Sequence, residues 1–272
     1  MAPETSLTYL PVDGRGWRLA MGLRPLAPEH WLEVDENRDA ELALKADLLA
    51  HSRATVLALT GEGEDACREL LEEVVASLRD FHPGVAVSVD GSEHPLVAAS
   101  RLVQEDLCVM VSDDEWRLVA ACVCFPSRWN LAEKIGASLD AIHDPVPGYD
   151  ESLAAPTRAV FDRLSPDKSF WRLNWTLLDN PDLHQPGPVR VPGGSAPEDW
   201  FFRVERQTIR RLARSHAVVF TIRNYVTALS SLLGDDVFIE NLLHALRTAP
   251  PATREYKGWG DIAERLAERI GR

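Results

Sequence analysis

Apolar residues recur at two different spacings along the chain, and the change between them separates helical from extended segments. Over 63–82, leucine and valine recur every three to four positions, which is typical of a helix with one buried face. Over 107–112 and 116–125 the pattern becomes two short apolar runs joined by an acidic turn, as expected for paired strands. Residues 171–177 alternate between apolar and polar side chains, which indicates a strand buried on one face.

These patterns predict an α+β fold, because strands and helices do not alternate in βαβ order. The core is expected to be an antiparallel sheet of about five strands, a common size for such sheets. Its strands are expected at 107–112, 116–125, 171–177, 200–209 and 217–226, and helices at 28–52, 63–82, 96–106, 129–136, 150–164, 227–247 and 259–270. A loop rich in Pro and Gly over 180–198 is expected to be mobile and on the surface. No boundary divides residues 1–272, so a single domain with helical extensions is expected.

The cysteine pattern indicates reduced core residues and no disulfide framework. One residue separates the last two cysteines, unlike the two-residue gap of zinc and redox motifs. In the strand predicted over 116–125, five alternating residues are expected to share one face: Trp116, Leu118, Ala120, Cys122 and Cys124. Both faces of this strand are apolar, which favours a central position in the sheet.

Charge and composition narrow the possible partners. The 272 residues carry a formal net charge of −13 with a pI of about 5.1, which disfavours nucleic acids and anionic membranes. An acidic surface suits solubility, a cationic substrate or a basic protein partner. No segment approaches the ~18 consecutive apolar residues of a membrane span, and no signal peptide is visible. A soluble, cytoplasmic protein is expected.

Several common catalytic motifs are missing from the sequence. It contains no Gly-rich phosphate loop and no dinucleotide fingerprint, no Gly-x-Ser-x-Gly nucleophile elbow and no His-Glu-x-x-His metal helix. The chain therefore has no recognisable nucleotide or flavin site of its own.

His143 is the histidine whose context suggests a metal ligand. It follows an apolar pair and precedes Asp144-Pro145, within a segment over 142–149 whose prolines and glycine are incompatible with a helix. A rigid loop that holds one imidazole suits an axial ligand, because the direction of the ligand must be fixed. A structural hydrogen bond is the alternative, and it is the commoner use of histidine.

The segment 202–212 is unusually polar for a stretch between apolar strands. As a strand, it would place Arg203, Glu205 and Gln207 on one face and Arg206 on the other. It is either a solvated edge strand held by ion pairs or a polar patch in a cavity. In the second case an arginine would bind a carboxylate and Glu205 would bind a cation.

Six segments together resemble the α-subunit of heme-dependent oxidative N-demethylase and its larger family. The resemblance runs from about residue 20 to residue 247, and its order and spacing are specific only when the segments are taken together. The segments are Met21–Leu26, Cys124–Gly136, Ile142–Tyr149, Trp171–Trp175, Arg203–Thr208 and Phe220–Val226.

The resemblance implies a PAS-like sheet that holds heme b through a histidine, for which His143 is the expected position. It also implies oxidative removal of a methyl group from an amine with O2, releasing formaldehyde, with electrons from a separate flavin and iron–sulfur reductase. Heme propionates favour arginine partners, and the candidates within the resembling segments are Arg128, Arg206 and Arg223. For Arg128, a purely structural ion pair is the alternative.

The proposed amine is cationic at neutral pH, so its site should offer a carboxylate near the iron. Glu205 is the expected residue, with Arg203 and Arg206 as ion-pair partners in the structural alternative. Tyr149 and Asn174 are expected to add hydrogen bonds. Two other functions remain open, a non-catalytic PAS-type heme sensor or carrier and a heme-free scaffold.

Overall fold

A seven-stranded antiparallel sheet organises the protein, in the order β1-β5-β6-β7-β3-β4-β2. The computed structural model describes residues 7–188 and 196–271. The strands are β1 (Arg24–Leu26), β2 (Leu57–Leu59), β3 (Asp106–Ser112), β4 (Trp116–Cys122), β5 (Ser169–Leu178), β6 (Phe201–Arg211) and β7 (Val218–Ala228). All five predicted strands are confirmed, and the fold class is α+β. The expected count of five was too low, because β1 and β2 have three residues each and are too short to show a period.

Most helices follow the predicted segments with shifted ends. The helix predicted over 129–136 was wrong, because this segment contains only a three-residue 3-10 helix, and the helix predicted over 227–247 begins at Asp236, because β7 continues to Ala228. Residues 28–52 divide into the 3-10 helix η1 and the helix α1, and the helix predicted over 96–106 ends at Ser100. The α-helices are α1 (Arg38–His51), α2 (Arg53–Val56), α3 (Glu64–Phe81), α4 (Pro95–Ser100), α5 (Leu139–His143), α6 (Tyr149–Ser152), α7 (Ala154–Arg163), α8 (Asp236–Thr248), α9 (Pro251–Tyr256) and α10 (Ile262–Arg269). Four 3-10 helices complete the set within the described part of the chain: η1 (Pro28–His30), η2 (Leu131–Glu133), η3 (Pro197–Asp199) and η4 (Leu229–Ser231).

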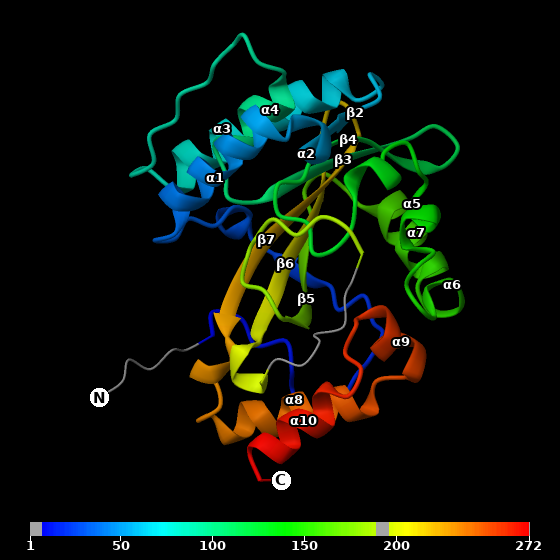
Figure 1. Cartoon of the computed structure of the whole chain (residues 1–272). Helices are drawn as coiled ribbons and strands as arrows, with labels where there is room; N and C mark the ends of the chain where they lie inside the picture. The colour runs from blue at the N-terminus through cyan, green and yellow to red at the C-terminus, as the bar shows by residue number, and fades with distance from the viewer. Residues whose placement is uncertain (1–6, 189–195, 272) are drawn as a thin grey trace.

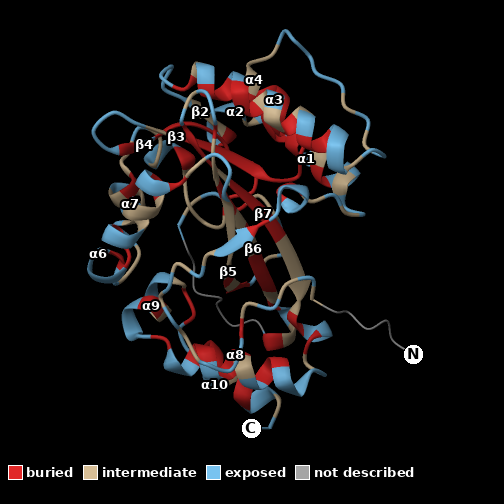
Figure 2. Ribbon diagram, turned by 180° about the vertical axis from the view of Figure 1, so that it is seen from behind, coloured by how far each residue is buried: buried red, intermediate tan, exposed pale blue. Residues whose placement is uncertain are grey.

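Three groups of helices pack around the sheet (Figure 1). Helices α1, α3 and α4 lie over one end of the sheet, α8 and α10 cover the other end, and α5, α6 and α7 form a lobe at its side. The helix faces turned to the sheet are buried, whereas the outer faces are exposed (Figure 2). Each group therefore buries one apolar stripe against the strands, which is the main source of stability in such a fold.

Strand β4 contains an irregularity that corrects one prediction. Val109 of β3 pairs with Ala120 and Met110 pairs with Leu118, so Val119 is an extra residue in β4. A bulge of this kind moves the following side chains to the opposite face. Trp116 and Leu118 accordingly pack in one apolar cluster, and Ala120, Cys122 and Cys124 pack in another. The expectation that all five share one face was wrong.

Strand β6 is central, which overturns its interpretation as an edge strand. It pairs along its whole length with β5 on one side and with β7 on the other. Pairing in register places five polar side chains on one face, which we call the polar face: Arg172, Asn174, Arg203, Glu205 and Gln207. The opposite face carries the two tryptophans of β5 together with Arg206 and Arg223. The predicted division of these strands into two faces is confirmed.

The remaining expectations concern the cysteines, a membrane span and the loop over 180–198. All four cysteines are free and buried, as predicted. Among the described residues, no helix combines the length and apolar character needed to cross a membrane. Residues 189–195 of the predicted loop lie outside the described residues. The part before them contacts the main body, because Gln185 accepts a hydrogen bond from the backbone N–H of Arg128 at 2.6 Å.

Candidate functional site

Glu205 is held on the polar face by two neutral amides. The side-chain nitrogens of Asn174 and Gln207 both donate to Oε2 of Glu205, at 3.1 and 2.9 Å. Within the described part of the chain, no residue hydrogen-bonds the other oxygen, Oε1, and no cation lies within ion-pair distance of Glu205. The carboxylate is therefore fixed through one oxygen, and its second oxygen is available to a ligand.

Lys257 reaches this group from the C-terminal end of the chain. It directly follows α9, and its Nζ donates to Oδ1 of Asn174 at 3.1 Å and to the backbone carbonyl of Trp175 at 3.2 Å. Burial lowers the pKa of Lys257 to about 8, although the nearby charge of Glu205 acts in the opposite direction. A lysine, an amide and a carboxylate thus form one hydrogen-bonded chain across β5 and β6.

Arg172 lies two residues before Asn174 on the same face of β5. Its Nε is buried and has no hydrogen-bond partner, and no residue described by the structure forms an ion pair with its guanidinium. Burial lowers the pKa of Arg172, while the charge of Glu205 partly opposes this effect. An unpaired cation in a half-buried position is unfavourable, so Arg172 is a candidate for binding an anionic group.

His143 is the last residue of α5, which packs on the polar-face side of the sheet. Ile142 belongs to the same apolar cluster as Phe170 and Ile209, which lie on that face of β5 and β6. The expectation that 142–149 is not helical was wrong at its start, because Ile142 and His143 form the end of α5, which Ser138 caps by accepting the N–H of Ala141. The helix nevertheless ends at the predicted Pro/Gly segment.

The ring of His143 is fixed by two contacts. Its Nδ1 lies 2.7 Å from the carbonyl oxygen of Leu139, and the ring stacks on Tyr149 with centroids 4.6 Å apart and planes at 11°. Burial lowers the pKa of His143, and the positive charge of Arg172 contributes in the same direction. The imidazole is thus neutral and oriented, and it lies within range of the charge of Arg172.

Tyr149 is almost fully buried at the start of α6. Its hydroxyl donates to Oδ1 of Asp140 at 3.4 Å, and burial raises the pKa of this hydroxyl to about 12. Residues Leu19 and Met21 pack against the same small apolar cluster. The structure therefore brings Tyr149 beside His143, and it brings Asn174 beside Glu205, as two groups on one side of the sheet.

Two of the three arginines expected to bind propionates lie on the opposite face and already have acidic partners. Arg206 lies 3.4 Å from Glu33, and Arg223 lies 2.6 Å from Asp35 and 2.8 Å from Glu41. Although burial acts to lower the pKa of Arg223, these carboxylates hold that pKa above its ordinary value.

The third of these arginines, Arg128, follows β4 and adopts a left-handed backbone conformation with φ of 62°. Its guanidinium forms an ion pair with Asp179 and donates from Nε to Gln185 at 3.1 Å. This contact ties the segment after β4 to the loop after β5. The ion pair with Asp179 therefore supports a purely structural role for Arg128.

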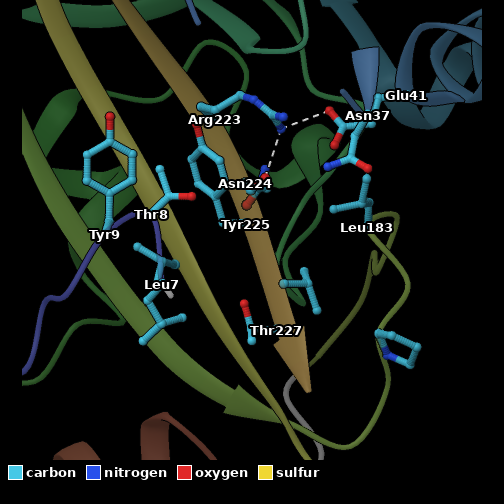
Figure 3. Close-up of a pocket in the computed structure, with 13 residues that line it drawn as sticks. Leu7, Thr8, Tyr9, Asn37, Glu41, Leu183, Arg223, Asn224, Tyr225 and Thr227 are labelled. Atoms are coloured by element: carbon cyan, nitrogen blue, oxygen red, sulfur yellow. Dashed lines mark hydrogen bonds and ion pairs between the residues drawn. The ribbon is translucent and has the colours of Figure 1, made fainter. Parts of the chain in front are cut away.

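A cavity of about 300 Å³ lies at the free edge of β7, where β3 no longer pairs with it. Figure 3 shows Arg223 in its wall, joined to Glu41 of α1 and to Asn224. Tyr9 and Tyr225 also line it, and His143 and Glu205 do not. The cavity is thus separate from Glu205 and His143. The charge of Arg223 in its wall is already satisfied by Asp35 and Glu41.

Sequence reasoning missed Arg172 of the polar face and Lys257, which contacts Asn174 on that face. Arg172 had a detectable signal, because the alternation over 171–177 places it beside Asn174. Lys257 had none, because it lies 83 residues from Asn174 in the sequence.

The arrangement combines a neutral, oriented imidazole, an unpaired arginine and a carboxylate with one available oxygen. A family model described as haem-dependent oxidative N-demethylase, alpha subunit-like, matches residues 22–267 of this chain. The match includes every element from β1 onward and nearly all of α10. It therefore spans the whole sheet, the residues of the polar face and His143. The chain therefore belongs to the haem-dependent oxidative N-demethylase alpha subunit-like family.

Proposed function

We propose that this protein is a heme b-dependent oxidase or monooxygenase that removes a methyl group from an amine substrate with O2. The family match over residues 22–267 carries this proposal, because the family description names both heme and oxidative N-demethylation. A separate flavin and iron–sulfur reductase is the proposed electron source. The PAS-like description of the sheet, a single domain over 1–272 and a cytoplasmic location remain predictions.

His143 is the proposed iron ligand, and its hydrogen bond fits that role. The partner of Nδ1 is a carbonyl oxygen of Leu139, which can only accept, so Nδ1 must carry the proton. In this tautomer Nε2 has the free lone pair that a metal requires. The stacked ring of Tyr149 restricts rotation of the imidazole. A fixed direction and a neutral ring are both properties of an axial histidine.

The residues of the polar face are proposed to bind the amine. Bound heme would supply the redox chemistry with O2. The ammonium group of the substrate would donate to Oε1 of Glu205, since Oε2 is occupied by Asn174 and Gln207. A charge-assisted hydrogen bond of this kind is shorter and stronger than a neutral one. Asn174 and Tyr149 are proposed to add hydrogen bonds to the substrate or to O2.

The first experiment is reconstitution of the purified chain with iron protoporphyrin IX. A Soret band is expected in the wild type and in His51→Ala, which changes an exposed histidine of α1. The band should shift or disappear in His143→Ala. A wild-type protein without a Soret band would exclude the proposed function.

The second experiment distinguishes an enzyme from a non-catalytic heme sensor or carrier, which is the alternative. The reconstituted protein is supplied with NADPH, a surrogate reductase and a panel of methylamines, and formaldehyde is measured. Turnover that depends on both O2 and the protein supports the enzyme. Heme binding with no formaldehyde from any amine supports the sensor or carrier.

A further inference from the structure

Arg172 is a cation on the polar face of the sheet that has neither an ion pair nor a hydrogen-bond partner among the described residues. Its Nε is buried without a hydrogen-bond partner, and none of the described residues forms an ion pair with it. Three other arginines also have an unpartnered Nε: Arg210, Arg211 and Arg223. Each of these three donates through its terminal nitrogens to a carboxylate or a carbonyl, and Arg172 does not. Arg172 therefore differs from every other buried arginine of this group.

The position of Arg172 relates it to His143. Arg172 lies on the polar face of β5, directly after Phe170 and Trp171, and Phe170 packs in the cluster that also contains Ile142 of α5. Arg172 and His143 therefore lie on the same side of the sheet, so an anion bound by Arg172 would lie on the side that carries the imidazole. Its charge would also offset the cost of burying an unpaired guanidinium.

The identity of the anion follows from its position. A planar guanidinium with free N–H groups matches a carboxylate in a two-point geometry. Glu205 interacts with Arg172 only at longer range, since no ion pair joins them and Oε2 of Glu205 already accepts from two amides. The ligand proposed at His143 would supply such a carboxylate.

We propose that Arg172 binds a propionate of the heme, in place of the three arginines that already have protein partners. This inference rests on the proposed heme site. It deepens that site by naming the residue that anchors the acidic edge of the cofactor. Arg206 and Arg223 lie on the opposite face of the sheet with their own carboxylates, and Arg128 is bound to Asp179. None of them is free to meet a second anion without breaking an existing ion pair.

The test compares heme and its dimethyl ester, in which both propionates lose their charge. Dissociation of each is measured as transfer to an excess of an apo-globin, for the wild type, Arg172→Gln, Arg172→Lys and Arg24→Gln. Arg24 is an exposed arginine of β1 beside Trp171 and provides the same change of charge. For free-acid heme, Arg172→Gln should dissociate about ten- to hundredfold faster than the wild type. Arg172→Lys should be intermediate, and Arg24→Gln should match the wild type.

For the dimethyl ester, the wild type and Arg172→Gln should dissociate at equal rates. A faster loss of both cofactors from Arg172→Gln would show that Arg172 acts on the fold, and equal retention of free-acid heme would show that it binds no propionate. Either result overturns the inference while leaving the heme site intact. A wild-type protein that binds neither cofactor would overturn the heme site as well.

Urea unfolding of the protein without heme provides an independent readout. Replacing an unpaired buried cation by a neutral amide should leave the unfolding midpoint unchanged or raise it. A structural arginine would instead lower the midpoint when replaced. A lowered midpoint in Arg172→Gln, together with equal loss of heme and its ester, would contradict the proposal.

Discussion

The Nζ of Lys257 lies 3.1 Å from Oδ1 of Asn174, and this contact decides how Asn174 faces Glu205. An ammonium group has three donors and no acceptor, so it can only face the oxygen of the amide. The nitrogen of the amide is thereby turned toward Oε2 of Glu205, where it donates at 3.1 Å. A residue near the C-terminus thus orients the carboxylate proposed to bind the substrate.

Replacing Lys257 should therefore weaken amine binding more than turnover. In Lys257→Met the amide of Asn174 is free to rotate, and Glu205 loses one fixed donor. We expect KM for the amine to rise about tenfold, equivalent to about 1.4 kcal/mol, with little change in kcat. Lys168→Met, which changes an exposed lysine before β5, is the matched control. An unchanged KM with a normal Soret band would show that Lys257 does not position Glu205.

Lys257 also predicts how stability depends on pH. Its pKa in the folded chain is about 8, below the ordinary value of 10.5, so between these values the unfolded chain binds more protons. The unfolding free energy should consequently rise as pH increases through this window. The reason is that burying the neutral amine of Lys257 costs less than burying its ammonium form. Urea unfolding at pH 7.5 and pH 9.5, values on either side of about 8, measures the effect.

The comparison is between the wild type and Lys257→Met at both pH values. The variant should lack the rise, whereas other titrating groups contribute equally to both proteins. A rise of the same size in Lys257→Met would assign it to a different group.

Glu205→Gln tests the proposed amine site while preserving the shape of the side chain. The carbonyl oxygen of the new amide can still accept from Asn174 and Gln207, but its other end becomes a donor that faces the ammonium. Loss of a charged hydrogen bond of ~1.5–3 kcal/mol predicts that kcat/KM falls at least tenfold. The Soret band should persist, and amine-induced spectral shifts should weaken.

Glu36→Gln is the control for this prediction, because it removes an exposed acid and the same charge. Loss of heme from Glu205→Gln would make Glu205 a structural residue. Unchanged heme and unchanged turnover would show that the amine binds elsewhere.

Arg223→Met should destabilise the fold through the ion pairs on the opposite face. The guanidinium is 1% exposed and joins Asp35 and Glu41, so its removal leaves two carboxylates without their positively charged partner. We expect the unfolding free energy of the heme-free protein to fall by about 3–5 kcal/mol, measured by urea unfolding. A stable variant that retains heme poorly would instead support Arg223 as the propionate ligand.

The sequence by itself determined which side chains share a face of the central strands. Alternation over 171–177 separates Trp171 and Trp175 from Arg172 and Asn174, and the register of β5 with β6 confirms this division. The reason is local, since successive side chains of a strand always point to opposite faces. Where β4 contains the extra residue Val119, the same rule failed, because a bulge depends on the pairing with β3.

Only the tertiary structure decided which charged groups have partners. Arg223 meets Asp35, 188 positions away in the sequence, whereas Arg172 meets no acid among the described residues. In the sequence, both are single arginines within segments where polar and apolar residues alternate. Local spacing determines the direction of a side chain, but its partner is chosen by packing between distant elements. The proposed heme and amine residues were therefore predictable as members of a face, and their charge partners were not.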